Sequence, residues 1–161
     1  MARQRLVTKQ VTLTTSAVFP NTAVFSYLKL NEPGTAFRLA QVKCTMISPS
    51  ENADDEYNTR LIQIYNQVSN SSGAGTANQL VHQFSRVQYK YTQTAVGVNE
   101  NIDLMPLIWN PPASFVLYGD YLRVVLDCDN TAIYTTANIT FYGYETKVSD
   151  IEKISQLRSI T

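Results

Sequence analysis

Apolar and polar residues alternate one by one along most of the chain. Val7, Val11 and Leu13 lie on one side of the first such stretch, and threonines occupy most of the other side. A period of two is typical of a β-strand with one buried and one exposed face. Patterns of this kind predict eight strands, at residues 7–14, 23–30, 36–47, 60–68, 80–91, 114–118, 121–128 and 131–146. We expect no helix before residue 148.

Local features refine this strand pattern. Between residues 36 and 47 the apolar positions shift from Phe37 and Leu39 to Val42 and Cys44, as one inserted residue at a β-bulge would cause. Gly119 and Asp120 separate two strand segments and predict a two-residue hairpin turn. Segment 48–59 shows no strand periodicity, and segment 70–78 is small, polar and glycine-containing, so we expect both to be loops. We expect a long connection at residues 91–110.

The predicted fold class is all-β, a two-sheet antiparallel sandwich of about eight strands, with a jelly roll favoured. Residues 6–147 form this domain, preceded by a flexible basic arm at residues 1–5 and followed by an amphipathic tail at residues 148–161. Alternation with polar neighbours assigns these residues to the core: Val11, Leu13, Val42, Cys44, Leu122, Val124, Leu126 and Ile139.

The C-terminal tail has a different pattern. Apolar residues recur there every third position, at Val148, Ile151, Ile154, Leu157 and Ile160. Ser149 and Glu152 fit a capping box, which predicts a short helix, with an irregular extended tail as the alternative. Because so short a helix is marginal alone in water, we expect Ile151, Ile154, Leu157 and Ile160 to contact a neighbouring subunit. Packing on their own sandwich is the alternative.

The composition favours a protein that works inside an assembly. Charged residues make up 16% of the chain, and 13 bases balance 13 acids. Neutral polar side chains replace them, since 51 of the 161 residues are Thr, Ser, Asn or Gln. A net charge of zero does not steer nucleic acid or an anionic membrane to a protein, and it favours self-association. We also find no apolar run long enough for a membrane helix.

Catalytic chemistry is sparse in the sequence. His82 is the only histidine, and it alternates with Leu80 and Phe84 as a strand residue would. Cys44 and Cys128 lie in apolar strand patterns and fit buried side chains, although the sequence leaves open whether they pair. No nucleotide, zinc or serine-hydrolase motif is found. We therefore predict no enzyme activity, no cofactor and no metal.

Two residue groups are candidates for binding. Trp109, Tyr118 and Tyr121 lie near the expected hairpin and could stack on sugar rings, although aromatic strand residues more often pack within sheets. Arg3, Arg5 and Lys9 place three positive charges before the first acid, where they could contact nucleic acid or a neighbouring subunit. The simpler interpretation of these three is a frayed, solubilising terminus.

The segments RQRLVTKQVTLTT, LYGDYLRVVLDCDN and ITFYGYETK carry a resemblance of architecture. Together with a short basic arm and a tail after the last strand, they make the chain similar to small single jelly-roll virion proteins of viruses or phages, of the capsid, penton or decoration type.

This resemblance implies a non-enzymatic structural protein whose partners are copies of itself and other virion proteins. It implies a place in the virion after synthesis in the host cytoplasm. The arm has fewer arginines than genome-packaging capsid proteins often carry, so we expect weak nucleic-acid contact at most. The alternatives are a carbohydrate- or receptor-binding sandwich, such as a lectin-like module or fibre head, and a β-sandwich enzyme.

Overall fold

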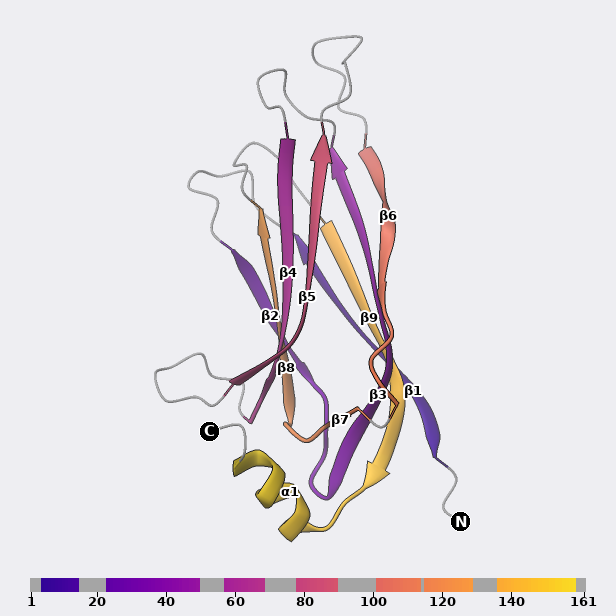
Figure 1. Ribbon diagram of the computed structural model, residues 1–161, viewed down its shortest axis with the longest axis vertical. Helices are drawn as coiled ribbons and strands as arrows, with labels where there is room; N and C mark the ends of the chain where they lie inside the picture. Colours follow the sequence, from indigo (N-terminus) through magenta and orange to yellow (C-terminus); the bar gives the residue numbers. More distant parts are fainter. Residues whose placement is uncertain are drawn as a thin grey trace.

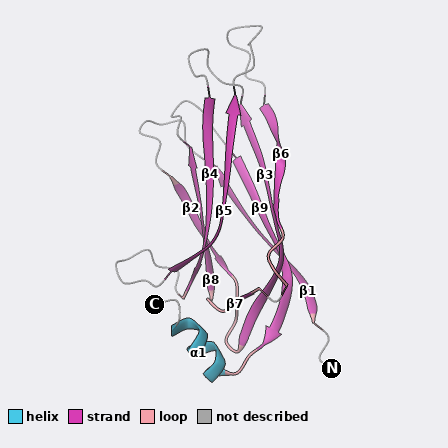
Figure 2. Ribbon diagram, in the orientation of Figure 1, coloured by secondary structure: helices cyan, strands magenta, loops and turns pink. Residues whose placement is uncertain are grey.

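The computed structural model of the chain describes residues 4–14, 23–49, 57–68, 78–89, 101–113, 115–128 and 136–158. Within these ranges lie nine strands and one short helix (Figure 2). The elements are β1 (Arg5–Thr14), β2 (Val24–Lys29), β3 (Thr35–Pro49), β4 (Tyr57–Gln67), β5 (Asn78–Tyr89), β6 (Asn101–Trp109), β7 (Val116–Leu117), β8 (Tyr121–Cys128), β9 (Thr136–Lys147) and α1 (Asp150–Arg158).

The strands form two antiparallel sheets that face each other, and α1 lies at one end of the sandwich (Figure 1). One sheet has the order β1-β9-β3-β6, with the short β7 attached to β3, and the other has the order β2-β8-β4-β5. Apart from β7, the pairs are nested: β1 with β9, β2 with β8, β3 with β6 and β4 with β5. Successive pairs alternate between the sheets. This arrangement is a jelly roll, so the predicted fold class is confirmed.

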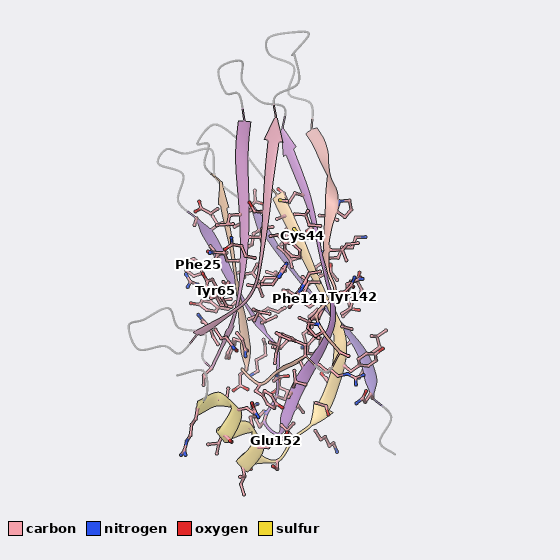
Figure 3. The ribbon with its side chains drawn as sticks, in the orientation of Figure 1. Phe25, Cys44, Tyr65, Phe141, Tyr142 and Glu152 are labelled. Atoms are coloured by element: carbon pink, nitrogen blue, oxygen red, sulfur yellow. The ribbon has the colours of Figure 1, made fainter. Side chains whose placement is uncertain are left out.

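The core lies between the two sheets. All eight residues that the alternation assigned to it are buried, and Cys44 and Phe141 lie between the sheets in Figure 3. Phe37, Ile62 and Ile64 belong to the same apolar cluster. Each fully buried side chain of this size contributes about 1.5–3 kcal/mol relative to an exposed one. The side chain of Cys128 lies outside the described residues.

The predicted bulge in β3 is confirmed. Leu39 pairs with Gly143 of β9, and Gln41 pairs with the adjacent Tyr142, so one extra residue of β3 stands between them. This insertion moves the inward positions of β3 from Phe37 and Leu39 to Val42 and the residues beyond it.

The predicted hairpin at Gly119 and Asp120 is wrong. Val116 and Leu117 pair with β3, whereas β8 pairs with β2 and β4 in the other sheet, so this turn carries the chain between sheets. The segment that follows β2 holds the turn. Asn31 Nδ2 donates hydrogen bonds to the carbonyls of Leu117 (2.9 Å) and Gly119 (2.8 Å).

The segment 91–110, expected to be a connection, contains the strand β6 (Asn101–Trp109). It pairs with β3 at the edge of its sheet, with Trp109 opposite Val42. Pro106 lacks the backbone N–H of a central strand residue but is tolerated at an edge. The proline and an irregular apolar pattern conceal the strand in the sequence.

Candidate functional site

The tail helix begins as its sequence predicts. The backbone N–H of Glu152 donates to Ser149 Oγ (3.2 Å), which caps the first turn. Just before the helix, the N–H of Val148 donates to the carbonyl of Gly34 in the β2–β3 turn (3.0 Å). These contacts fix where α1 leaves the sandwich.

A buried lysine attaches α1 to the sandwich. Lys153 is only 8% exposed, and its Nζ lies 2.7 Å from Asp120 Oδ1 in the β7–β8 turn. The same Nζ donates to the carbonyl of Glu32 (3.4 Å). Since a buried charge is costly unless it is paired, this ion pair decides which side of the helix faces the sandwich.

Tyr118 and Glu152 form a second polar contact between the turn and the helix. The Tyr118 hydroxyl donates to the Glu152 carboxylate. Partial burial of the ring raises the pKa of this hydroxyl, and the negative charge and the hydrogen bond of Glu152 raise it further. We name Lys153, Asp120, Glu32, Tyr118 and Glu152 the tail clasp.

The apolar residues of the helix lie mostly on the side away from the clasp. Ile151 is 84% exposed and Ile154 is 52% exposed, whereas Leu157 is half-buried. Ile160 lies outside the described residues. The tail thus packs on its own sandwich through a lysine and an ion pair, and two of the four residues predicted to contact a neighbour face solvent.

The basic residues near the N-terminus lie in two settings. Arg3 is outside the described residues, while Arg5 begins β1 and pairs in register with Glu145. Lys9 lies within β1 and is half-buried, and its Nζ donates to the carbonyl of Lys29 (3.3 Å). Lys9 is therefore a strand residue that links the edges of the two sheets.

The three aromatic residues predicted to contact a glycan have different surroundings. Trp109 stacks on His82, with ring centroids 4.2 Å apart and planes inclined by 3°, and contacts Phe115 edge-on. Tyr118 belongs to the tail clasp. Tyr121 lies at the start of β8, with Lys29 Nζ 4.8 Å from its ring centroid. The structure does not bring these three residues together into one binding platform.

His82 joins the edges of the two sheets. It lies on β5, whereas its stacking partner Trp109 lies on β6, and Phe84 contacts the imidazole edge-on at 4.5 Å. Burial lowers the pKa of the imidazole, because the charged form is disfavoured away from water. These contacts suit a packing role for a neutral histidine.

A group of side chains that the sequence analysis did not single out lies on the outer face of the sheet β2-β8-β4-β5. Arg123 is the centre of this group. Its guanidinium carbon lies 5.0 Å from the Phe25 ring centroid and 5.8 Å from that of Tyr65, and Tyr27 contacts Phe25 edge-on at 5.8 Å. Figure 3 shows Phe25 and Tyr65 on the same outer side of the sandwich, away from Cys44 and Phe141.

These side chains meet because neighbouring strands place them in register. Arg123 of β8 lies opposite Tyr27 of β2 and Tyr65 of β4. One row further along, Lys29 lies opposite Tyr121. We name these six residues, Phe25, Tyr27, Lys29, Tyr65, Tyr121 and Arg123, the aromatic–arginine face. The alternation pattern marks their outward positions, but only the strand order brings three distant segments together.

The described residues offer no centre for a metal. Among them, no group of three or more His, Cys, Asp or Glu side chains is placed to hold an ion. In the same part of the chain, no helix has the length and apolar character needed to cross a membrane.

The chain is similar to known proteins in structure and not in sequence. No protein-family model and no curated protein sequence matches it. Among solved structures, it is similar to the VP1 protein of Trichodysplasia spinulosa-associated polyomavirus, determined in complex with 6'-sialyllactose. The match covers 89% of this chain and 96% of that chain, with 8% identity and a TM-score of 0.44. Values this low transfer no function to the present chain.

Proposed function

We propose that this chain is a non-enzymatic structural subunit of a virus particle, which self-assembles or decorates a capsid. On this proposal its partners are copies of itself and other virion proteins, and it reaches the virion after synthesis in the host cytoplasm. Jelly rolls occur in viral capsid proteins, lectins and cupins. Since a fold does not determine a function, the choice depends on the surface of the chain.

The observation that carries the proposal is the orientation of α1. The helix buries Lys153 and leaves Ile151 and Ile154 in water. A subunit that functioned alone would gain by the opposite orientation, because burial of one isoleucine side chain is worth about 1.5–3 kcal/mol. Contiguous exposed apolar side chains are typical of interaction sites. Ile151 and Ile154 are neighbours on the helix surface, three positions apart, and a neighbouring subunit would cover them.

The outer face of the sheet β1-β9-β3-β6 gives further support. Hydroxyl and amide groups pair across its strands: Thr12 Oγ1 donates to Asn138 Oδ1 (2.6 Å), and the hydroxyls of Thr14 and Thr136 lie 3.0 Å apart. Neutral groups of this kind can meet a partner without the desolvation cost of charges. They do not attract phosphates, which agrees with nucleic-acid contact that is weak at most.

Particle formation tests the proposal. The purified full chain should form discrete oligomers or closed particles in sedimentation velocity and electron microscopy, alone or with its capsid. A chain that stays monomeric at all concentrations, and binds no other virion protein, would contradict it.

A carbohydrate- or receptor-binding role is the second candidate, favoured by the aromatic–arginine face. Exposed aromatic rings can stack on sugars, and an arginine can bind an acidic group. A glycan array with wild type, Phe25→Ala and the control Tyr142→Ala tests it. Tyr142 lies on the opposite outer face (Figure 3), so binding that F25A alone abolishes would support this candidate.

A further inference from the structure

The aromatic–arginine face carries positive charge that the described residues do not neutralise. Neither Lys29 nor Arg123 has a carboxylate within ion-pair distance among them. Asp127 lies on the same side of β8, but four residues beyond Arg123 in a strand, which is about 13 Å. Phe25 is 48% exposed beside this charge. The face therefore offers an apolar ring and two available cations together.

The rings also hold Arg123 in place. Its guanidinium lies against Phe25 and Tyr65, and its Nε is buried without a hydrogen-bond partner, as is the Tyr27 hydroxyl. An arginine held between rings loses little conformational freedom when it binds a carboxylate. Tyr, Phe and Arg are also the residues enriched at the centres of protein interfaces. This composition fits an apolar, acidic protein surface.

The first turn of α1 has these properties. Ile151 and Ile154 are exposed, and Asp150, an acidic residue of the same turn, is exposed beside them, whereas Glu152 contacts Tyr118 in the tail clasp. The basic residue Arg158 lies in the last turn, eight residues and about 12 Å further along the axis. The amino-terminal half of the helix is thus apolar and acidic where the aromatic–arginine face is apolar and basic.

We infer that the first turn of α1 in one copy of the chain docks on the aromatic–arginine face of a second copy. This inference rests on the proposed self-assembly and names the surface that receives the tail. The tail clasp holds α1 at the end of its own sandwich, so its exposed isoleucines face away from that sandwich. Because helix and face are different surfaces, the contact is heterologous and generates a ring or a chain of subunits.

Two full-length variants separate the two sides of the contact. The helix variant carries Ile151→Ser and Ile154→Ser, and the face variant carries Phe25→Ser and Arg123→Gln. Each alone should be folded by circular dichroism but monomeric by sedimentation velocity. Mixed, they should form a 1:1 complex and nothing larger, because one intact helix then meets one intact face.

Other outcomes overturn the inference. If either variant assembles alone as wild type does, its surface is not part of the contact. If both are monomeric and the mixture forms no complex, the two surfaces do not bind each other. A face variant that loses glycan binding but keeps assembly would assign the face to a receptor instead. If wild type itself does not self-associate, the inference fails, whereas the proposed function fails only if the chain also binds no other virion protein.

A control and a second variant complete the test. Ile108 on β6 is 53% exposed, as Ile154 is to a similar degree. It lies in the sheet β1-β9-β3-β6, which does not carry the aromatic–arginine face, so Ile108→Ser should assemble normally. Equal loss in I108S would overturn the inference. Should the face variant fail to fold, Lys29→Glu replaces it, since Lys29 is exposed. We expect K29E to lose assembly and the same chain with Asp150→Lys added to regain it. No recovery in the double variant would contradict the contact.

Discussion

Lys153 of α1 and Asp120 of the β7–β8 turn form an ion pair at 2.7 Å, with the lysine side chain 10% exposed and the aspartate 33% exposed. Together with the other contacts of the tail clasp, this pair attaches the tail to the sandwich and sets the orientation of the helix. The exposed side chains of Ile151 and Ile154 are left for contacts outside the sandwich. The tail is thus held by charge on its inner side and presents isoleucine on its outer side.

Asp120→Asn should release α1 without unfolding the sandwich. The buried Lys153 would lose its charged partner, so the free energy of local opening should fall by about 1–3 kcal/mol. Hydrogen exchange at residues 150–158 measures this opening. Adding Lys153→Met should restore protection, because an apolar side chain needs no partner. Unchanged exchange in D120N would show that the pair does not hold the helix.

The sandwich should be less stable in mild acid because of His82. Burial lowers the pKa of His82 in the folded chain, so between 6.5 and that lower value the unfolded chain binds more protons. The free energy of unfolding should therefore fall as the pH decreases through this window, by less than about 1.4 kcal/mol per pH unit. His82→Gln should reduce this slope in urea titrations at several pH values. Equal slopes in wild type and His82→Gln would show that His82 does not cause the pH dependence of stability.

Val124→Ala should lower the free energy of unfolding by about 1–3 kcal/mol. Val124 is fully buried between the sheets, and its truncation leaves a cavity. Val68→Ala is the matched control, since Val68 is 38% exposed and should change stability little. Chemical denaturation of both variants measures the difference, and similar values would contradict the assigned core.

Gly119→Ala should destabilise the turn that carries the chain between sheets. A Cβ at Gly119 would meet the side-chain oxygen of Asn66 and lie 2.5 Å from the carbonyl oxygen of Gln67. Relieving such overlap costs about 1–3 kcal/mol. Thermal unfolding measures the loss, with Gly34→Ala as a comparison, because a Cβ there has open space and is strained only by a φ of 76°. An unchanged melting temperature in G119A would contradict the close approach.

Much of the fold can be predicted because it depends on local alternation. Val11, Leu122 and Ile139 are buried as their alternation predicts. The bulge in β3 is visible as a one-residue shift of the apolar positions, and Ser149 is a recognisable helix cap. These features need only neighbours along the chain.

Apart from the strand β6, which its proline and irregular apolar pattern conceal, the errors concern contacts between distant segments. The turn at Gly119 resembles a hairpin, but Asn31 holds it where the chain crosses to the other sheet. Lys153 would be assigned to solvent from its charge, because nothing near it in sequence indicates Asp120 as a partner. The aromatic–arginine face joins residues of three strands, and only the order β2-β8-β4 brings them together.

The central claim is that the tail joins subunits, and sedimentation velocity of the chain lacking residues 148–161 tests it most directly. Circular dichroism in the same samples verifies that the sandwich is folded. We predict oligomers for the full chain and a folded monomer for the truncated chain at the same concentration. A truncated chain that assembles as the full chain does, or that fails to fold, would show that the tail is not the contact between subunits.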